Sequence, residues 1–475
     1  MSKGLSESAV FVPIRRLSEM VRDRQVSPVE LAETFLGRLE SLGPVYNAVV
    51  TVTGERAMEQ ARRAEREIAA GRNRGPLHGI PYGAKDLLAT SGGIPTTWGA
   101  EPFRQQRFDH DATVVRKLEE AGAVLAAKLA MVELAGGMGY LSPDASFTGP
   151  GLNPWDTATW SGGSSSGAGS AVAAGLVPFA IGSETWGSIL GPAANCGVAG
   201  LRPTYGRVSR HGAMALSWTL DKLGPLCLTA DDCGLVLEAI AGPDPNDPTA
   251  SSRPYRYGGA PELARPFKLG VLNGAVEGVG EAVRDNFNLA LKVLDEIATI
   301  EEVELPEYPY EAVTRTIANA ESASAFEDYA LSGEAAGLRD SWDRYGPYAK
   351  EAVLATDYLK ALRLRGVIAR ETDRVLASFD ALVAPAKPDV ASRVDRDRRK
   401  DSGTGRGDII GAVGNAAGLP AISVPSGFSD EGLPTGIQFM GRAYRENSVL
   451  AVARSYQSMT DWHEQHPADV PVTID

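Results

Sequence analysis

Residues 161–189 read SGGSSSGAGSAVAAGLVPFAIGSETWGSI. This stretch passes from a glycine- and serine-rich turn into a run of small residues, and then into a short apolar strand that ends in GSETWGSI. Glycine permits backbone conformations that other residues avoid and lets a ligand come close to the main chain. The turn therefore predicts either a structural bend or a binding loop at the start of a helix.

The usual glycine loops for phosphates do not fit this stretch. A P-loop continues with Gly-Lys-Ser or Gly-Lys-Thr, whereas Gly167 is followed by Ala168. A dinucleotide-binding loop has the pattern GxGxxG directly after a strand, and here Gly169 is followed by Ser170, Ala171 and further apolar residues. The apolar run also argues against a flexible linker. A structural turn and a cluster of catalytic serines are the interpretations that remain.

Strands and helices alternate on both sides of this stretch. The sequence predicts a strand and loop at 79–88, a helix near 111–122 and a strand near 123–128. Later strands are predicted at 267–274, 381–388, 421–427 and 436–441. Such alternation is typical of βα units, so we expect an α/β fold with a large mixed central β-sheet and helices on both faces.

The chain has no convincing linker and no internal repeat, so a single domain over residues 1–475 is expected. Its expected parts are an N-terminal helical segment at about 10–70, a catalytic core at about 75–245, a helical insertion at about 277–378, and C-terminal core strands with a helix at about 380–460. The first helix is predicted to begin at a capping box, Ser27-Pro28-Val29-Glu30. The charged stretch at 394–408 is predicted to be a solvated lid or mobile segment.

The composition limits the kinds of partner. Of the 475 residues, 47 are Lys or Arg and 60 are Asp or Glu, which gives a net charge of −13. An acidic chain is a poor match for nucleic acid or an anionic membrane surface. We therefore expect a small-molecule substrate, no nucleic acid and no membrane among its partners, and a homodimer is left open.

The cysteines and the apolar segments indicate where the chain works. Cys196, Cys227 and Cys233 are few and odd in number, and none has the spacing of a zinc site. The first residues lack the apolar stretch of a secretory signal, and the most apolar window, 168–181, is too short to span a membrane. The expectation is a cytoplasmic protein without a metal or organic cofactor.

A catalytic serine needs a base, and the five histidines of the chain do not provide an obvious one. None of them accompanies a nucleophile elbow of the form GxSxG. Lys85, in the segment HGIPYGAKDLLAT, follows an apolar strand with almost no other charge nearby. Burial lowers the pKa of a lysine by as much as about 3–5 units, so a buried Lys85 would serve as a base. A solvated surface position is the other reading of a single lysine.

Several motifs occur together, in order: GIPYGAKD, GGSSSG, GSETWGSI, GVAGLRPTYGRVSRHG, GLPAISVPSGF and LPTGIQFMGR. In this order and spacing the chain resembles the amidase-signature hydrolases over about residues 25–460. The resemblance implies a Ser–cis-Ser–Lys unit in which Ser188 is the nucleophile, Ser164 is the bridging serine after a cis peptide bond, and Lys85 is the base. It also implies hydrolysis of a carboxylic amide C–N bond through an acyl-enzyme.

The resemblance assigns further roles around the nucleophile. The backbone N–H groups of Thr185, Trp186, Gly187 and Ser188 would receive the oxyanion that forms during attack. Ser165 is a candidate support for the relay. The remaining serines of the region, Ser161, Ser166, Ser170 and Ser183, are interpreted as holding turns and helix starts.

The nucleophile turn departs from the family pattern G-[S/T]-D-x-G-G-S-I-R. Glu184 replaces the aspartate, Trp186 the first glycine and Leu190 the arginine. These changes bear on the substrate. Together with Trp155, Trp160 and Trp218, the bulky Trp186 indicates either core packing or an aromatic-walled pocket for aryl amides or carbamates (urethanes).

The leading functional prediction is a stand-alone amidase, with carbamates or esters as further substrates. The alternative is the glutamine-hydrolysing subunit of a tRNA-dependent amidotransferase, which looks similar across the same motifs. The three departures in the turn count against this alternative, because a polar glutamine favours charged anchors. A catalytically inactive binding protein is disfavoured, because Lys85, Ser164 and Ser188 are all retained.

Overall fold

The computed structural model describes residues 10–139, 142–259, 265–342, 344, 352–395, 408–468 and 470. Most of the charged stretch at 394–408 lies outside the described residues. The helices are α1 (Ile14–Arg22), α2 (Pro28–Ser41), α3 (Gly54–Ala69), α4 (Thr113–Glu120), α5 (Ser166–Ala173), α6 (Leu190–Cys196), α7 (Ala230–Ile240), α8 (Glu281–Asp295), α9 (Tyr310–Ala325), α10 (Glu327–Ser332), α12 (Ala355–Leu376), α13 (Ile409–Ala416) and α14 (Glu446–Gln457). None of the described helices is long and apolar enough to cross a membrane.

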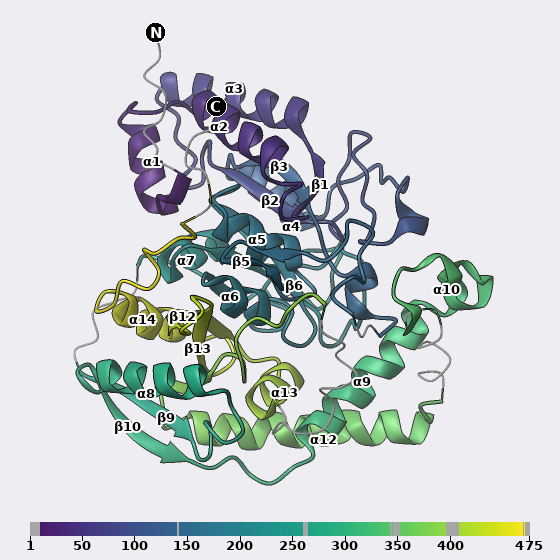
Figure 1. Cartoon of the computed structure of the whole chain (residues 1–475), viewed down its shortest axis with the longest axis vertical. Helices are drawn as coiled ribbons and strands as arrows, with labels where there is room; N and C mark the ends of the chain where they lie inside the picture. Colours follow the sequence, from purple (N-terminus) through teal and green to yellow (C-terminus); the bar gives the residue numbers. More distant parts are fainter. Residues whose placement is uncertain are drawn as a thin grey trace.

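An 11-stranded sheet forms the centre of the fold, in the order β1-β3-β2-β6-β8-β7-β12-β13-β11-β9-β10 (Figure 1). Its strands are β1 (Val49–Val52), β2 (Pro81–Lys85), β3 (Val124–Leu129), β6 (Phe179–Glu184), β7 (Ala199–Arg202), β8 (Lys222–Cys227), β9 (Phe267–Leu272), β10 (Ala298–Val303), β11 (Ala381–Pro385), β12 (Ala421–Phe428) and β13 (Pro434–Met440). Strand β2 runs parallel to β3 and β6, whereas β6 and β8 are antiparallel. The predicted mixed sheet is confirmed.

Helices cover both faces of this sheet. Successive side chains of a strand point to opposite faces, and in β6 Phe179 and Ile181 enter one core while Ala180 enters another. The first core contains apolar residues of α4, α7 and α14, and the second contains those of α2, α3, α5 and α6. The predicted arrangement of helices on both faces is therefore confirmed.

The small residues of α5 serve close packing. Every residue of this helix is buried. A Cβ added at Gly167 would lie 2.3 Å from the Ala48 carbonyl oxygen and 2.5 Å from the Ala130 nitrogen. A larger side chain there would push the helix away from the neighbouring main chain. The glycine keeps α5 against the sheet, directly after the serine cluster.

Two stretches predicted to be helical contain strands. β1 lies within 10–70, and β10 lies within 277–378. Both stand at the ends of the sheet, where one strand edge has no neighbouring strand among the described residues. β10 reads ATIEEV, in which Ala298, Ile300 and Val303 are buried or half-buried and Thr299 and the two glutamates are exposed. The prediction of helix was wrong for β1 and β10, because segments of four and six residues are too short for periodicity to identify.

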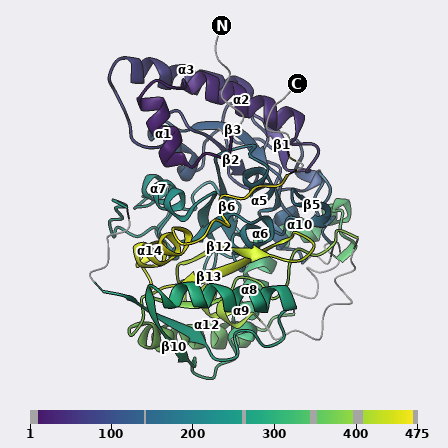
Figure 2. The ribbon, with the colours of Figure 1, turned by 60° about the vertical axis from the view of Figure 1, so that its left-hand side comes forward.

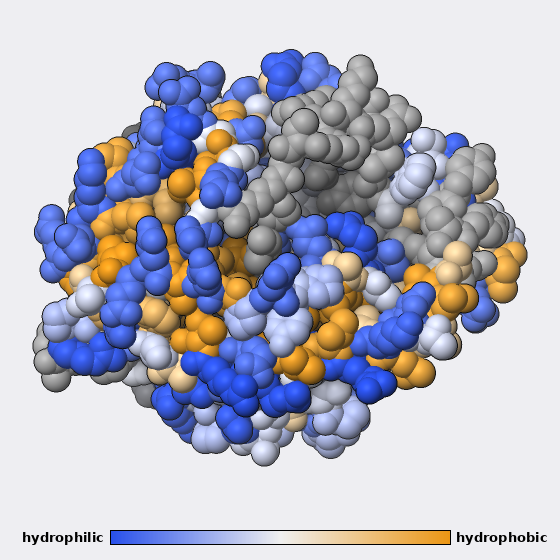
Figure 3. Space-filling model, turned by 90° about the horizontal axis from the view of Figure 1, so that it is seen from below, coloured by the Kyte–Doolittle hydropathy of each residue, from blue (hydrophilic) through white to orange (hydrophobic). Residues whose placement is uncertain are grey.

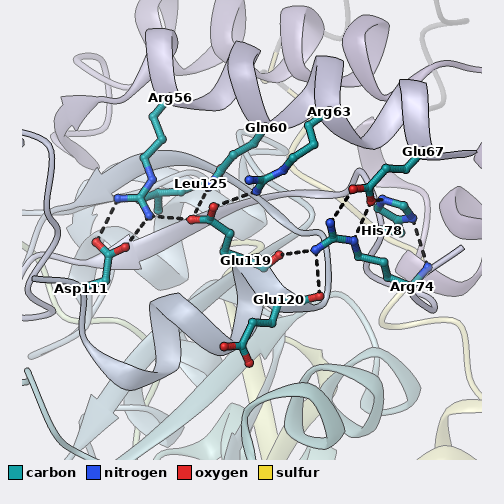
Figure 4. A network of polar contacts seen from close by, with 10 residues as sticks. All are labelled: Arg56, Gln60, Arg63, Glu67, Arg74, His78, Asp111, Glu119, Glu120 and Leu125. Carbon is teal, nitrogen blue, oxygen red and sulfur yellow. Dashed lines mark hydrogen bonds and ion pairs between the residues drawn. The ribbon is translucent and has the colours of Figure 1, made fainter. Parts of the chain in front are cut away.

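The N-terminal helices are held to the sheet by charges as well as by apolar contacts. Helix α2 begins with the predicted capping box between Ser27 and Glu30. In α3, Arg56 binds Asp111 at 2.7 Å and Glu119 at 2.9 Å, and Arg63 binds Glu119 at 2.8 Å (Figure 4). Glu119 thus joins two arginines of α3 to α4.

Replacing Glu119 with alanine should lower the free energy of unfolding by about 1–3 kcal/mol, because half-buried donors lose their acceptor. The exposed neighbour Glu120 pairs with Arg116 at the surface, so Glu120→Ala should change stability by less than about 0.5 kcal/mol. The midpoints of urea unfolding compare the two variants. Equal midpoints would show that the network does not anchor α3.

The C-terminal part of the sheet carries the helices of the insertion. Helix α9 packs against α12 and α13, and Figure 2 shows α8, α12 and β10 at the end of the molecule opposite to α2 and α3. Seen from that end, the surface carries hydrophilic side chains with apolar groups between them (Figure 3). α9 also reaches the residues that follow β6, where the site lies.

Candidate active site

Lys85 is the last residue of β2 and is fully buried. Its Nζ atom lies 2.7 Å from Ser164 Oγ, 2.9 Å from Ser183 Oγ and 3.0 Å from Ser165 Oγ. The loop before α5 provides Ser164 and Ser165, and the adjacent strand β6 provides Ser183. The fold thus surrounds the amine with three hydroxyl groups.

Neighbouring hydrogen bonds indicate the direction of these contacts. The Ser165 hydroxyl donates to the Ser183 carbonyl at 3.2 Å, so its oxygen accepts from Lys85. An uncharged amine has two N–H groups and one lone pair. If Ser165 and Ser183 accept the two N–H groups, the lone pair is free to accept the Ser164 proton.

Burial lowers the pKa of Lys85 to about 7, although the negative charges of Asp221 and Glu184 oppose this shift. Near neutral pH a large fraction of the amine is therefore uncharged. An uncharged amine at hydrogen-bond distance from a serine is suited to general-base catalysis.

Ser188 follows the end of β6 and is 9% exposed. Its carbonyl accepts a hydrogen bond of 3.3 Å from the Ser165 N–H, which holds the turn from Thr185 to Ser188 beside the serine loop. The Gly163–Ser164 peptide bond is cis, as the resemblance implied. Among the described residues the Ser188 hydroxyl forms no hydrogen bond, so its contact to this group is through the backbone.

The turn from Thr185 to Ser188 offers backbone donors. Gly187 has a φ of 78°, whereas Trp186 stays outside the left-handed region. In the described part of the chain, the N–H groups of Trp186, Gly187 and Ser188 donate to no protein acceptor. Unengaged N–H groups next to a nucleophile are the groups that an oxyanion requires.

Glu184 braces this turn. Its carboxylate accepts the N–H groups of Ile189 at 2.9 Å and Leu190 at 3.1 Å, and it binds the Arg202 guanidinium at 2.9 Å. Burial would raise the pKa of Glu184, but Arg202, Lys222 and the N–H donors hold it at about 2. Glu184 is thus an anion that joins the two ends of the turn. Arg202, which the sequence analysis did not single out although it stands in GVAGLRPTYGRVSRHG, provides the matching charge.

A cavity of about 1020 Å³ opens beside the turn. Trp160, Trp186 and Leu190 line it from the side of the serines, and the loops at 272–279 and 303–311 line it from the other side. The Trp186 indole N–H donates to Asp408 at 2.8 Å. The Arg315 guanidinium of α9 lies over the Trp186 ring, 5.3 Å from its centre.

The other tryptophans occupy different surroundings. Trp155 donates its indole N–H to the Cys196 carbonyl at 2.9 Å and packs against Phe428, and it is not a lining residue of this cavity. Trp218 is 42% exposed and borders a smaller cavity of about 210 Å³. Of the tryptophans considered from the sequence, Trp160 and Trp186 therefore line the large cavity, and Tyr308 and Tyr310 add further aromatic surface to it.

Ser183 is the group that the sequence analysis missed. It was interpreted as holding a turn, but its hydroxyl contacts Lys85. Ser161 and Ser170 donate to backbone carbonyls, as that interpretation requires. The pairing of β2 with β6 would have revealed Ser183, because it places the end of β6, which carries Ser183, beside the end of β2, which carries Lys85. Among the described residues, no three His, Cys, Asp or Glu side chains gather in a way that could hold a metal ion.

The family model described as Amidase matches residues 30–450, and the chain belongs to this family. The chain is therefore a hydrolase that cleaves amide C–N bonds. A glutamyl-tRNA(Gln) amidotransferase subunit from Moorella thermoacetica is 37% identical over 488 residues, which cover 96% of this chain and 98% of that protein.

Solved structures agree with this family. The peptide amidase from Stenotrophomonas maltophilia is 30% identical, with a TM-score of 0.84 over 94% of this chain and 96% of that one. A bacterial aryl acylamidase of the amidase signature enzymes is 26% identical, with a TM-score of 0.85 over 98% and 99% of the two chains. The resemblance drawn from the motifs is confirmed. The curated relatives support the amidotransferase alternative better than the stand-alone hydrolase.

The predicted set of partners is wrong. The sequence analysis excluded nucleic acid and expected only a small molecule, whereas the relatives are named as one subunit of an enzyme for glutamyl-tRNA(Gln). The net charge of −13 averages the whole surface. It says nothing about a substrate that a second subunit holds, and for this reason the net charge was a misleading guide to the partners.

Proposed function

We propose that Ser188 is the nucleophile, Ser164 the bridging serine and Lys85 the general base. As Ser188 Oγ forms a bond to the carbonyl carbon, its proton passes to Ser164 and the Ser164 proton passes to Lys85. The oxyanion is received by the N–H groups of the turn from Thr185 to Ser188. The proton on Lys85 returns to the nitrogen as the C–N bond breaks, and water then hydrolyses the acyl-enzyme.

We propose glutamine as the amide and an amidotransferase acting on a charged tRNA as the setting. The observation that carries this proposal is the identity of 37% to the Moorella amidotransferase protein, over nearly the whole of both chains. The charges of the cavity are compatible with it. Arg315 and Lys387 offer cations for a carboxylate, and Asp408 offers an anion for an ammonium group.

A second candidate is the hydrolysis of a bulkier, apolar amide or carbamate. It is favoured by Trp186, which fills the space beside the nucleophile turn, and by the large volume of the cavity compared with a glutamine side chain. Structural neighbours described as a peptide amidase and an aryl acylamidase support the same reading. A single catalytic unit would serve either substrate.

Incubation of the purified chain with a mixed panel separates the two candidates. The panel contains glutamine, aliphatic amides, aryl anilides, aryl carbamates and esters, and mass spectrometry detects the products. Glutamine hydrolysis that appears or rises when partner subunits are added supports the amidotransferase. Rapid cleavage of anilides or carbamates by the chain alone, with glutamine untouched even in the presence of partner subunits, contradicts it.

Replacing Trp186 with glycine should raise kcat/KM for glutamine relative to an anilide by about 10–200-fold, because the site loses apolar contact and gains room for a polar substrate. Trp218→Gly is the matched control, because Trp218 borders the other cavity. Its ratio should equal that of the wild type. An unchanged ratio in Trp186→Gly would show that this side chain does not select the substrate.

We also propose a cytoplasmic location. The three cysteines are free and buried, which suits a reducing compartment. A family of enzymes named for a tRNA substrate supports the same location. Imaging of a fluorescent fusion in a bacterial host would check it.

A further inference from the structure

Asp221 holds the first residue of the nucleophile turn. It stands immediately before β8, the strand that pairs with β6. Its carboxylate accepts the Thr185 hydroxyl at 2.6 Å and the N–H groups of Leu216 at 2.8 Å and Ser217 at 2.9 Å. Burial raises the pKa of Asp221, whereas all three partners donate and favour the ionised carboxylate.

Asp221 acts from the side of the turn that faces away from the substrate cavity. Trp186 and Gly187 line the cavity of about 1020 Å³. Ser183, Thr185 and Asp221 line the smaller cavity behind them. From Ser183 to Trp186, alternate residues thus face different cavities: Ser183 and Thr185 line the smaller one, and Glu184 and Trp186 line the larger one. Asp221 therefore contacts the turn through Thr185 and does not reach the large cavity itself.

The loop that carries Asp221 is itself anchored to the helical insertion. Glu321 of α9 is buried and accepts the Ser217 hydroxyl, the Thr219 N–H at 3.1 Å and the Thr219 hydroxyl at 2.7 Å. Tyr358 of α12 donates to the same carboxylate at 2.9 Å. A continuous set of hydrogen bonds joins α9 and α12 to the nucleophile turn.

We propose that Asp221 is a positioning residue, which fixes the donors of the oxyanion turn by holding Thr185 from behind. The proposal rests on the proposed roles of Ser188 and of the turn. A fixed carboxylate that receives a hydroxyl and two N–H groups leaves Thr185 little freedom. Displacement of an oxyanion donor by about 1 Å is sufficient to cost roughly 10²-fold in rate.

The same carboxylate acts on Lys85 through space. The negative charges of Asp221 and Glu184 raise the pKa of Lys85 against the effect of burial. Other charged groups near these residues include Asp86 with Lys128 on the β2–β3 side, Arg202 and Lys222 on β7 and β8, Arg210 and Asp247 beside the smaller cavity, and Arg365 of α12. Helix α5 brings no charged residue to this place. Removing the charge of Asp221 should therefore lower the pKa of Lys85.

The test compares Asp221→Asn, Thr185→Val and Asp247→Asn in the full chain, using the amide that the panel identifies. Asp221→Asn should lower kcat by about 10–100-fold with little change in KM. It should also move the acid limb of the kcat/KM profile, where kcat/KM falls as the pH decreases, to lower pH. Thr185→Val should lower kcat without moving the limb. Asp247 lines the same smaller cavity but binds Arg210 and Thr249 instead of the turn, so Asp247→Asn should change neither.

The outcomes distinguish this proposal from the assignment of the nucleophile. An active Ser188→Ala variant would overturn the assignment itself. An inactive Ser188→Ala variant together with wild-type kcat and an unmoved acid limb in Asp221→Asn would overturn only the positioning role. If Asp221→Asn fails to fold, Thr185→Val decides, because it removes just the hydroxyl contact. Wild-type kcat in that variant also overturns the proposal.

Discussion

Replacing Ser188 with alanine should lower kcat by about 10⁴-fold or more for every amide that the chain cleaves. No other serine of the cluster lies in the turn with the unengaged N–H groups. Ser164 and Ser165 bind Lys85 directly and cannot take over the position of the nucleophile. Turnover measured by product formation over several hours gives the ratio to the wild type.

Ser170→Ala is the matched control, because it removes the same atom from another buried serine of the same stretch, 161–189. The Ser170 hydroxyl donates to the Leu152 carbonyl and lies outside the network of Lys85. This variant should keep wild-type kcat. An activated carbamate should add its acyl mass to the peptide that contains Ser188 in the wild type and leave no adduct in Ser188→Ala. An adduct on another serine would show that this other serine, and not Ser188, is the nucleophile.

The elements around the site could be predicted because their signals are local. The capping box of Ser27 and Glu30 lies within four residues, and the apolar run before Lys85 is typical of a buried strand. The strands from 381 to 440 were predicted for the same reason and are confirmed. Local patterns also led to errors: β10 is a six-residue edge strand, too short for periodicity to separate it from a helix.

The contacts that shape the site could not be predicted, because they join residues far apart in the sequence. Ser183 meets Lys85 only because β6 lies beside β2, and Arg202 meets Glu184 only because β7 and β8 follow in the sheet. Sequence spacing does not give this strand order. Sequence also left open, for each tryptophan, a choice between core packing and a pocket wall: the Trp155 indole donates to the Cys196 carbonyl, whereas Trp160 and Trp186 line the large cavity.

The pH dependence of the wild type should report Lys85. Its pKa is lowered to about 7, and the proposed mechanism requires the uncharged amine. Below this value kcat/KM should therefore fall tenfold for each pH unit, and above it kcat/KM should reach a plateau. Burial also raises the pKa of Asp232 to about 7, so a second group titrates in the same range. Asp232 binds Thr229 and the start of α1, away from the serines.

Lys85→Met should lower kcat by about 10²–10⁴-fold, the usual contribution of a general base, and should abolish the acid limb. Methionine keeps the length of the side chain in its buried channel but accepts no proton. Lys85→Arg should be as inactive, because a guanidinium stays protonated at every accessible pH. Asp232→Asn should keep the limb at about pH 7. If the limb persisted in Lys85→Met and moved in Asp232→Asn, the base would have to be sought outside β2.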